Sequence, residues 1–371
     1  MRILIINWRD IRNPEAGGAE IHLHQTFTRI VALNHEVTLL CSKFPGAKDL
    51  DQIDGIDIIR YGGKWTFNIT ALWYYRKYLV NREFDILIED INKIPFFLPL
   101  FSKKPRVMVL LHHLFGKNFY RETNLLFATY LYFMEWLIPR VYQHCCFEVV
   151  SESCRDELFQ KGIPLDNINV VYNGLDVAFK RVSNNFEDKD PNLVVYLGRL
   201  KKYKNVDHLI QAMVIVREQV PEVRLIIGGT GDQRESLEKL VWSKNLEEIV
   251  SFTGYVSESE KIGLFTRASV AAYPSNKEGW GITVIEANAC GTPVVATEVP
   301  GLSEAVLDGE TGVLTPLADP NAMAEGLIRL LNNRRERERL AQNAIVRSRL
   351  YDWDNTAQKT VEIIGEAMGE C

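Results

Sequence analysis

The chain has 371 residues, 46% of them hydrophobic and 25% charged, which is typical of a globular protein with two domains of ordinary size. Its net charge of −5 argues against a nucleic-acid-binding protein. The six cysteines show no CxxC pair and no zinc-ligand spacing, so we expect free thiols and no metal site. The beginning of the chain lacks the apolar run and cleavage site of a signal peptide, which favours a cytoplasmic protein.

The first half of the chain begins with an apolar strand at residues 2–7. Gly17 and Gly18 follow at the start of an amphipathic helix that contains Glu20. A later strand, residues 106–111, ends in the pair His112-His113. Adjacent residues of a strand point to opposite faces, so we expect only one of the two imidazoles to be functional. Strands of this half are predicted near Ile3, Val37, Ile58, Ile86, Val109 and Val149.

Two aromatic segments raise the question of a membrane. Residues 123–139 carry one charge, Glu135, but are shorter than the ~20 apolar residues that span a bilayer, so we expect a domain helix there. Between Trp65 and Tyr78, several aromatic residues occur together with the bases Arg76 and Lys77. A core-facing aromatic helix with exposed bases is the favoured interpretation, and peripheral docking on the inner face of a membrane is the alternative.

In the second half, strands are predicted near Val195, Leu225, Val250, Val270 and Val294. Strands alternate with helices along the whole chain, which predicts an α/β protein with two doubly wound parallel-sheet domains. The polar segment 179–192, which contains Pro191, is interpreted as the linker. We therefore expect domains at 1–180 and 190–351. Asp188 and Asp190 match a DxD metal signature, but they fall in this linker and are discounted.

The most informative segment is residues 278–286, where two glycines lie between Glu278 and Glu286. It follows an apolar strand and precedes a helix pattern. Gly279 and Gly281 allow the backbone N–H groups of the helix start to approach a phosphate, which the helix dipole favours. Carboxylates accept hydrogen bonds from sugar or ribose hydroxyls. We place Glu278 at the mouth of the site and Glu286 two turns along the helix.

Two further strand ends supply candidate ligand contacts. Arg199 and Lys204 follow the strand near Val195, and open α/β sheets bind ligands at the carboxyl ends of their strands, so both are placed to hold a diphosphate. Gly228, Gly229 and Gly231 follow the next strand. Either the glycines let the backbone of this turn approach a nucleotide closely, or they mark only a tight strand-to-helix connection.

These motifs occur in one order that resembles the family-four retaining glycosyltransferases of the GT-B fold. The resemblance covers nearly the whole chain and is strongest from Val194 to Pro316. It rests on the following motifs: Gly198-Arg199, Lys204-Asn205, the Gly228–Gly231 turn, residues 252–255, residues 278–286 and residues 289–295. The resemblance implies two Rossmann-like domains facing a cleft, with a last helix, residues 352–371, that crosses back to the first domain.

The resemblance also implies roles for individual residues. The acceptor-side domain would place Gly17, Gly18 and Glu20 near the donor phosphates or the acceptor. His112 takes the position of a histidine near the transferred sugar, but His113 replaces the aspartate that commonly follows it. In the nucleotide-sugar domain Glu278 would contact the sugar and Glu286 the ribose. The remaining residues assigned to substrate binding are Gly229, Tyr255, Val256, Gly279, Trp280, Gly281, Ile282 and Thr283.

The function implied is transfer of a hexosyl unit from a UDP- or GDP-sugar to a glycan, lipid or small-molecule acceptor, with retention of anomeric configuration and without a cofactor or essential metal. Arg199, Lys204 and the helix start at Gly281 would stabilise the leaving diphosphate. The motifs specify neither the donor sugar, the acceptor nor the oligomeric state. A GT-B nucleotide-sugar epimerase and a non-catalytic nucleotide-sugar-binding subunit are the alternatives. A dinucleotide oxidoreductase is disfavoured, since no GxGxxG follows the first strand.

Overall fold

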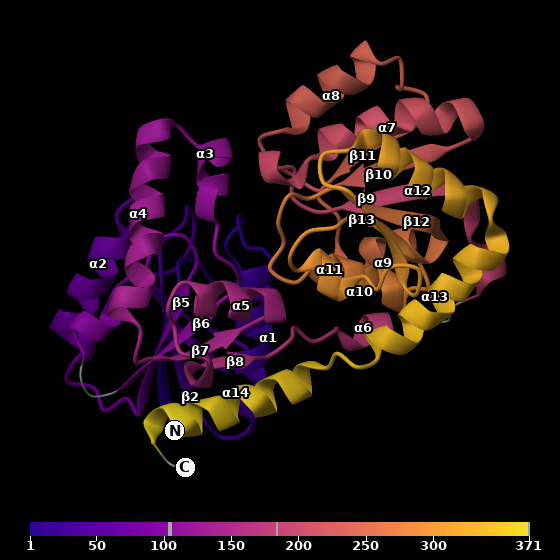
Figure 1. Ribbon diagram of the computed structural model, residues 1–371. Coiled ribbons are helices and arrows are strands. Elements are labelled where there is room, and N and C mark those ends of the chain that lie inside the picture. Colours follow the sequence, from indigo (N-terminus) through magenta and orange to yellow (C-terminus); the bar gives the residue numbers. More distant parts are fainter. Residues whose placement is uncertain (103–105, 183–184, 370–371) are drawn as a thin grey trace. The chain divides into compact units, whose positions relative to one another are not determined.

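In the computed structural model, which describes residues 1–102, 106–182 and 185–369, the chain divides into two compact units. The first unit comprises Met1–Gly174 and the chain from Asp352 onward, and the second comprises Leu175–Tyr351. Each unit is an α/β layer structure with helices on both faces of a sheet (Figure 1). The predicted fold class, with two parallel-sheet α/β domains, is confirmed.

The first unit contains an eight-stranded sheet in the order β3-β4-β2-β1-β5-β6-β7-β8. All neighbours pair in parallel except β3 and β4, which form an antiparallel edge. The strands are β1 (Arg2–Ile6), β2 (Glu36–Cys41), β3 (Leu50–Ile53), β4 (Ile56–Arg60), β5 (Ile86–Ile91), β6 (Arg106–Leu111), β7 (Cys146–Val149) and β8 (Ile168–Val170). The edge strands β3 and β8 are short and were not predicted.

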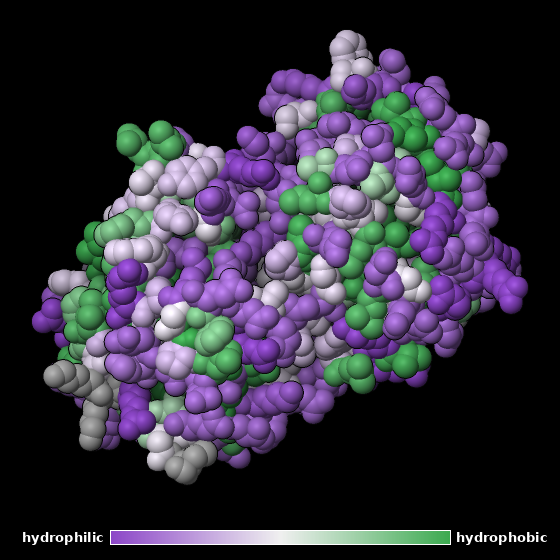
Figure 2. All heavy atoms as spheres, viewed as in Figure 1, coloured by the Kyte–Doolittle hydropathy of each residue, from purple (hydrophilic) through white to green (hydrophobic). Residues whose placement is uncertain are grey.

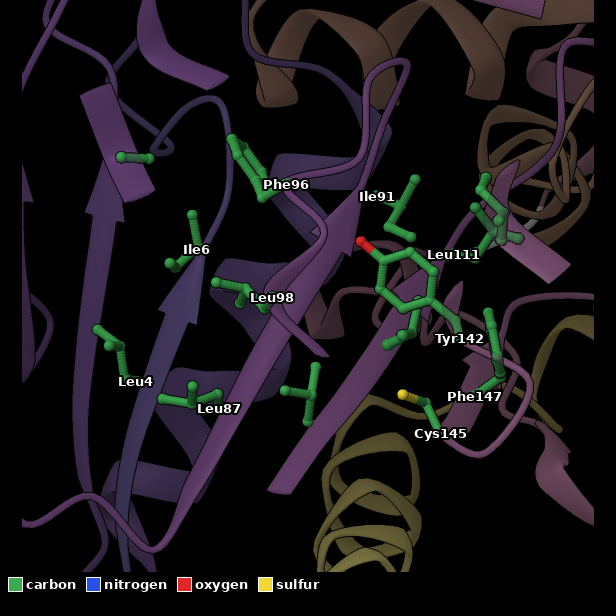
Figure 3. Packing of buried hydrophobic residues seen from close by; sticks show 14 of the residues in the cluster. Leu4, Ile6, Leu87, Ile91, Phe96, Leu98, Leu111, Tyr142, Cys145 and Phe147 are labelled. Carbon is green, nitrogen blue, oxygen red and sulfur yellow. The ribbon is translucent and has the colours of Figure 1, made fainter. Parts of the chain in front are cut away.

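Both faces of this sheet are covered, because successive residues of each strand point to opposite sides. Leu4 and Ile6 of β1 pack in one core, which Figure 3 shows together with Leu87, Leu111 and Tyr142. Ile3 and Ile5 pack in the other core. The helices are α1 (Gly18–Ala32), α2 (Phe67–Tyr74), α3 (Phe119–Glu122), α4 (Leu125–Val141), α5 (Glu152–Gln160) and α14 (Trp353–Met368), with a π-helical turn η1 (Tyr75–Leu79) and a 3₁₀ turn η2 (Leu98–Leu100). Helices α1 and α14 cover the second core.

The second unit contains a six-stranded parallel sheet in the order β11-β10-β9-β12-β13-β14. Its strands are β9 (Asp190–Leu197), β10 (Arg224–Gly228), β11 (Val250–Gly254), β12 (Ala268–Tyr273), β13 (Val294–Thr297) and β14 (Gly312–Thr315). The chain builds outward from β9 to β11 and then returns to place β12 on the other side of β9. The strand order therefore reverses between β9 and β12, and such switch points are where open α/β sheets bind ligands.

Helices of the second unit also lie on both sides of its sheet. Helix α7 packs beside α12, and α10 packs beside α9 and α13, and Figure 1 shows these groups on opposite sides of the strands. The helices are α6 (Val177–Lys180), α7 (Val206–Gln219), α8 (Arg234–Ser243), α9 (Glu258–Arg267), α10 (Ile282–Ala289), α11 (Leu302–Ala305), α12 (Pro320–Asn332) and α13 (Arg334–Ser348), with the 3₁₀ turns η5 (Phe186–Asp188) and η6 (Lys202–Lys204).

The prediction that residues 179–192 form a linker was wrong. Gly174 and Leu175 mark the division, and the segment belongs to the second unit. Phe179 is buried, and the Lys189 ammonium contacts five oxygen acceptors of that unit, among them the carbonyls of Ala268 and Cys290. Residues 183–184, within the predicted linker, lie outside the described residues. The polar sequence that suggested a linker is here part of the folded second unit, and its Lys189 is partly buried among these acceptors.

The segment 123–139 forms most of α4, as expected of a domain helix. Asn124 begins it by accepting a hydrogen bond from the Phe127 N–H at 3.0 Å, a normal helix N-cap. In the described part of the chain, no helix is both long and apolar enough to cross a membrane.

Candidate functional site

The switch point of the second unit brings two predicted motifs together. The loop after β9 carries Arg199 and Lys204, and the loop after β12 carries Glu278. Because β9 and β12 are neighbours in the sheet, these loops lie side by side at the carboxyl ends of the strands. The Lys204 ammonium donates a hydrogen bond to Oε1 of Glu278, and Ser275 donates another to the same oxygen at 2.7 Å. The two charged candidates therefore form one site.

Lys204 and Glu278 are largely withdrawn from water, with 14% of each side chain exposed. Burial opposes the charged form of Lys204, but the Glu278 carboxylate outweighs it, so the pKa of Lys204 is raised above its usual value. Lys204 thus stays cationic at neutral pH. An ammonium has three N–H donors. Among the described residues, Glu278 is the one hydrogen-bond acceptor recorded for Lys204, which leaves donors for a phosphate.

Asn205 fixes the loop that carries Lys204. Its backbone is left-handed, with φ 48°, and its buried side-chain amide donates to the Pro274 carbonyl at 3.1 Å and to Asn276 at 2.8 Å. These bonds tie the loop after β9 to the loop after β12. Arg199 is more exposed and donates to the Tyr203 hydroxyl at 3.0 Å. The structure therefore places Arg199 at the rim and Lys204 inside.

Helix α10 begins at Ile282, four residues after Glu278. Its N-cap Gly281 has φ 86°, a left-handed conformation that favours glycine, and Gly279, Gly281, Ile282 and Thr283 are all partly exposed. The N–H groups of this first turn are the donors expected for a phosphate. Trp280 differs, because its ring is buried and packs edge-on against Tyr351 with 5.2 Å between centroids. It anchors the glycine bend by packing, where the sequence suggested a substrate contact.

Glu286 lies nearer the bend than expected. Helix α10 begins at Ile282, so Glu286 is about one turn into the helix, where the sequence suggested two. It is buried, and Lys261 of α9 donates to its Oε1 at 2.8 Å. Burial raises the pKa of Glu286 to about 7, and Lys261 partly opposes this shift. In the described chain its second oxygen, Oε2, has no hydrogen-bond partner, so it is available as an acceptor.

The glycine turn after β10 is explained by packing within the protein. A Cβ at Gly229 would lie 1.9 Å from the Gly198 carbonyl oxygen, and one at Gly231 would lie 2.1 Å from that of Leu200. The tight-connection interpretation therefore accounts for this turn without a ligand, and Gly229 is required by the chain itself. Tyr255 and Val256 follow the neighbouring strand β11. Tyr255 is highly exposed, and Val256 is partly exposed.

In the first unit, the strand order reverses between β1 and β5, and the predicted residues gather around the loop after β1. Gly17 precedes α1, and its N–H donates to Glu20 at 2.7 Å. Glu20 is buried, and its other oxygen lies 3.9 Å from Arg9. Gly18 is exposed, and a Cβ built there would meet nothing within 4 Å. Nothing in the described protein thus demands a glycine at position 18.

His112 and His113 point to different surroundings. Nε2 of His112 lies 3.4 Å from Asp90, and its ring is 5.1 Å from that of His22, whereas the His113 ring packs on Phe115 at 4.4 Å. Burial opposes protonation of His112, but Asp90, with smaller contributions from Glu20 and Glu148, outweighs it and raises the pKa of His112. His112 is therefore the imidazole that belongs to an acidic cluster.

Sequence reasoning missed three groups of this arrangement. Lys261 neutralises Glu286, Asp90 faces His112, and His22 lies between Asn173 (2.7 Å) and Glu148 (3.4 Å). No local sequence pattern pointed to Lys261, because its partner Glu286 comes from another helix. A sequence signal did exist for Asp90, since an acidic residue near the carboxyl end of a fully buried strand is unusual. Among the described residues, no group of three or more His, Cys, Asp or Glu is placed to hold a metal ion. Cys371 lies outside them.

Gly18 and Gly231 make a matched test of why a glycine is present. We expect Gly231→Ala to destabilise the second unit, because its Cβ would clash with the Leu200 carbonyl, whereas Gly18→Ala should leave stability unchanged or raise it by roughly 0.5–1 kcal/mol through helix propensity. If a ligand approaches Gly18 closely, Gly18→Ala will lower activity despite an unchanged melting temperature. Equal activity of wild type and Gly18→Ala would remove this glycine from the site.

Comparison with known proteins covers both units. A family model described as "Glycosyltransferase Family 4" matches residues 16–179, and one described as "Glycosyl transferases group 1" matches residues 179–347. An uncharacterised glycosyltransferase of Methanocaldococcus jannaschii is 32% identical over 63% of this chain and 63% of its own length. A D-inositol 3-phosphate glycosyltransferase of Thermomonospora curvata is 32% identical over 57% of this chain and 54% of its own length. These alignments span less than two thirds of the length of either relative.

Solved structures resemble the whole chain. A sucrose-phosphate synthase from Thermosynechococcus elongatus superposes with a TM-score of 0.82 at 21% identity, covering 100% of both chains. HepE of Anabaena, in complex with UDP-glucose, superposes with a TM-score of 0.76 at 20% identity, again covering 100% of both chains. At such identities the likeness shows the fold alone.

Proposed function

Because the chain belongs to the family-four glycosyltransferases, of the GT-B fold, we propose that it is a retaining, metal-independent hexosyltransferase. Its donor is a UDP- or GDP-sugar, and its acceptor is a glycan, lipid or small molecule. The single observation that carries the proposal is the Lys204–Glu278 pair beside the first turn of α10, at the switch point of the second sheet. The complex of HepE with UDP-glucose supports a nucleotide-sugar donor.

The chemistry of glycosyl transfer requires this arrangement of charge. As the bond from the anomeric carbon to the diphosphate breaks, negative charge grows on the leaving oxygen. The Lys204 ammonium and the N–H groups of α10 are preorganised donors for that charge, and Arg199 adds a second cation at the rim. Glu278 holds Lys204 in place with one oxygen and offers the other to a sugar hydroxyl.

The buried pair Glu286 and Lys261 is proposed to hold the nucleotide. Lys261 keeps one oxygen of Glu286 occupied, and Oε2 remains as an acceptor for a ribose hydroxyl. The proposed base pocket lies at Tyr255 and Val256, whose exposed tyrosine ring offers a stacking surface. In the first unit, Gly17, Gly18, Glu20 and His112 are proposed as the sugar and acceptor contacts, with Asp90 positioning the His112 ring.

Titration calorimetry with UDP, GDP and ADP, each with and without EDTA, tests the proposal. We expect one nucleotide to bind in the micromolar range without loss in EDTA, and Glu286→Gln to weaken that binding about tenfold through one hydroxyl contact. Turnover of the matching sugar nucleotide should then release the nucleoside diphosphate only when an acceptor is present.

Other outcomes distinguish the alternatives. Binding without turnover on any acceptor, together with epimerisation of the free donor, would identify an epimerase. Binding without either reaction would identify a nucleotide-sugar-binding subunit. Failure of all three nucleotides to bind would reject the assignment of the donor site.

A further inference from the structure

The first unit exposes an apolar surface that the proposed chemistry does not use. We define the aromatic face as Trp65, Ile69 and Trp73, in and just before α2, together with Leu126, Phe133 and Trp136 of α4. Trp65 is 78% exposed and Leu126 is 85% exposed. Figure 2 shows hydrophobic side chains at the tip and along the side of the region that α4 and α2 occupy in Figure 1. Soluble domains rarely expose contiguous apolar patches of this kind without a binding role.

The favoured sequence interpretation, a core-facing aromatic helix, holds for only half of this segment. Phe67, Ala71 and Tyr75 are buried in the core, but Ile69, Trp73 and Tyr78 are exposed. An open groove of about 630 Å³ is lined by residues of α2, η1 and α4, among them Ile69, Lys77 and Tyr130, together with residues 94–97 and Phe101. The aromatic face is therefore one surface built from α2 and α4.

The exposed charges of α2, η1 and α4 are all positive. Arg76, Lys77 and Arg140 are exposed. Lys77 lies 4.6 Å from the Trp73 centroid and Arg140 lies 3.3 Å from that of Trp136, while Arg76 lines the adjoining groove. The one acid in α2, η1 and α4 is Glu135, which is buried and accepts the Phe115 N–H at 2.7 Å. The chain as a whole carries −5, so these elements differ sharply from the rest.

We propose that the aromatic face docks on the surface of an anionic lipid bilayer. Aromatic and aliphatic side chains enter the boundary between headgroups and acyl chains, and Arg76, Lys77 and Arg140 contact the anionic headgroups. A second copy of this chain fits the surface less well, because pairing two copies would bring the same cations together. The proposal does not depend on the identity of the donor or the acceptor.

Sedimentation of the full chain with vesicles tests this docking. We expect binding to vesicles that contain phosphatidylglycerol, weaker binding at raised ionic strength, and little binding to pure phosphatidylcholine. Arg76→Gln with Lys77→Gln should weaken binding roughly thirtyfold, at about 1 kcal/mol per base. The matched control removes two exposed bases of the second unit, Lys244→Gln with Arg335→Gln, and should have little effect.

A second pair of double variants tests how much the apolar side chains contribute to vesicle binding. Leu126→Ser with Phe133→Ser should weaken vesicle binding by at least tenfold. Trp242→Ser with Leu350→Ser removes two exposed apolar side chains of the second unit, at 73% and 71%, and should not weaken vesicle binding. All four variants should keep the wild-type melting temperature and nucleotide affinity. The proposal is overturned if the wild-type protein does not bind anionic vesicles, or if the control variants lose as much vesicle affinity as the variants of the aromatic face. It is also overturned if the wild-type protein is a dimer that binds no vesicles and the Leu126 and Phe133 substitutions convert it to a monomer.

Discussion

We expect Lys204→Ala to lower kcat for sugar transfer by roughly 10²–10³-fold, the usual cost of removing one preorganised donor to a developing negative charge. Lys204 is the buried cation next to the first turn of α10, and its raised pKa keeps it charged throughout the neutral range. Its loss removes stabilisation that grows as the diphosphate leaves. Steady-state kinetics with the donor identified by calorimetry measures the effect.

Two further variants separate this role from a purely structural one. Lys202→Ala, an exposed lysine of the same 3₁₀ turn, should retain wild-type turnover. The single change Lys204→Ala also leaves Glu278 without its cation, which destabilises the loop. Adding Glu278→Gln should therefore restore much of the lost melting temperature but not the turnover. Recovery of both in the double variant would mean that the ion pair serves only the fold.

The sequence was sufficient for the fold class because the two sheets are built from strongly apolar strands. Each predicted strand centre, from Ile3 to Val294, falls in an observed strand. The short strands β3, β8 and β14 were missed, because their sequences, LDQI, INV and GVLT, mix polar residues or glycine with few apolar ones, whereas the equally short β7 and β13 are more fully apolar or buried. The linker was misplaced for a different reason. Its residues are polar, yet Lys189 and Phe179 make their contacts with elements far along the chain, which no local pattern records.

The candidate site was predictable where chemically suitable residues directly follow strands that the fold places side by side. Lys204 and Glu278 follow strands that a doubly wound sheet makes neighbours, so the switch-point rule anticipates their contact. Trp280 and Gly229 were assigned to substrate by their place in a motif, while the structure gives each a packing role. Lys261 and Asp90 lay outside any motif. A partner on another helix or strand becomes visible only in three dimensions.

Lys189→Met should cause the largest loss of stability, roughly 3–5 kcal/mol, because it strips the hydrogen-bond donor from a partly buried site. The ammonium lies within 3.3 Å of five oxygens, four of them backbone carbonyls at the ends of α9 and α10 and the start of β12. Methionine keeps the volume but donates nothing. Thermal or urea unfolding of the second unit measures the loss, and Lys244→Met, at an exposed position, is the control.

The pH dependence of this loss follows from the same contacts. Burial lowers the pKa of Lys189 to about 7, below the value near 10.5 of an unfolded chain. Between these values the unfolded chain binds more protons than the folded one, so the contribution of Lys189 to stability rises with pH from about 7 towards 10.5 and is lowest at and below pH 7. The difference in unfolding free energy between wild type and Lys189→Met should therefore widen from pH 7 to pH 9. A difference that stays constant over this range would mean that the pKa of Lys189 is not lowered and that the carbonyls hold it as a cation.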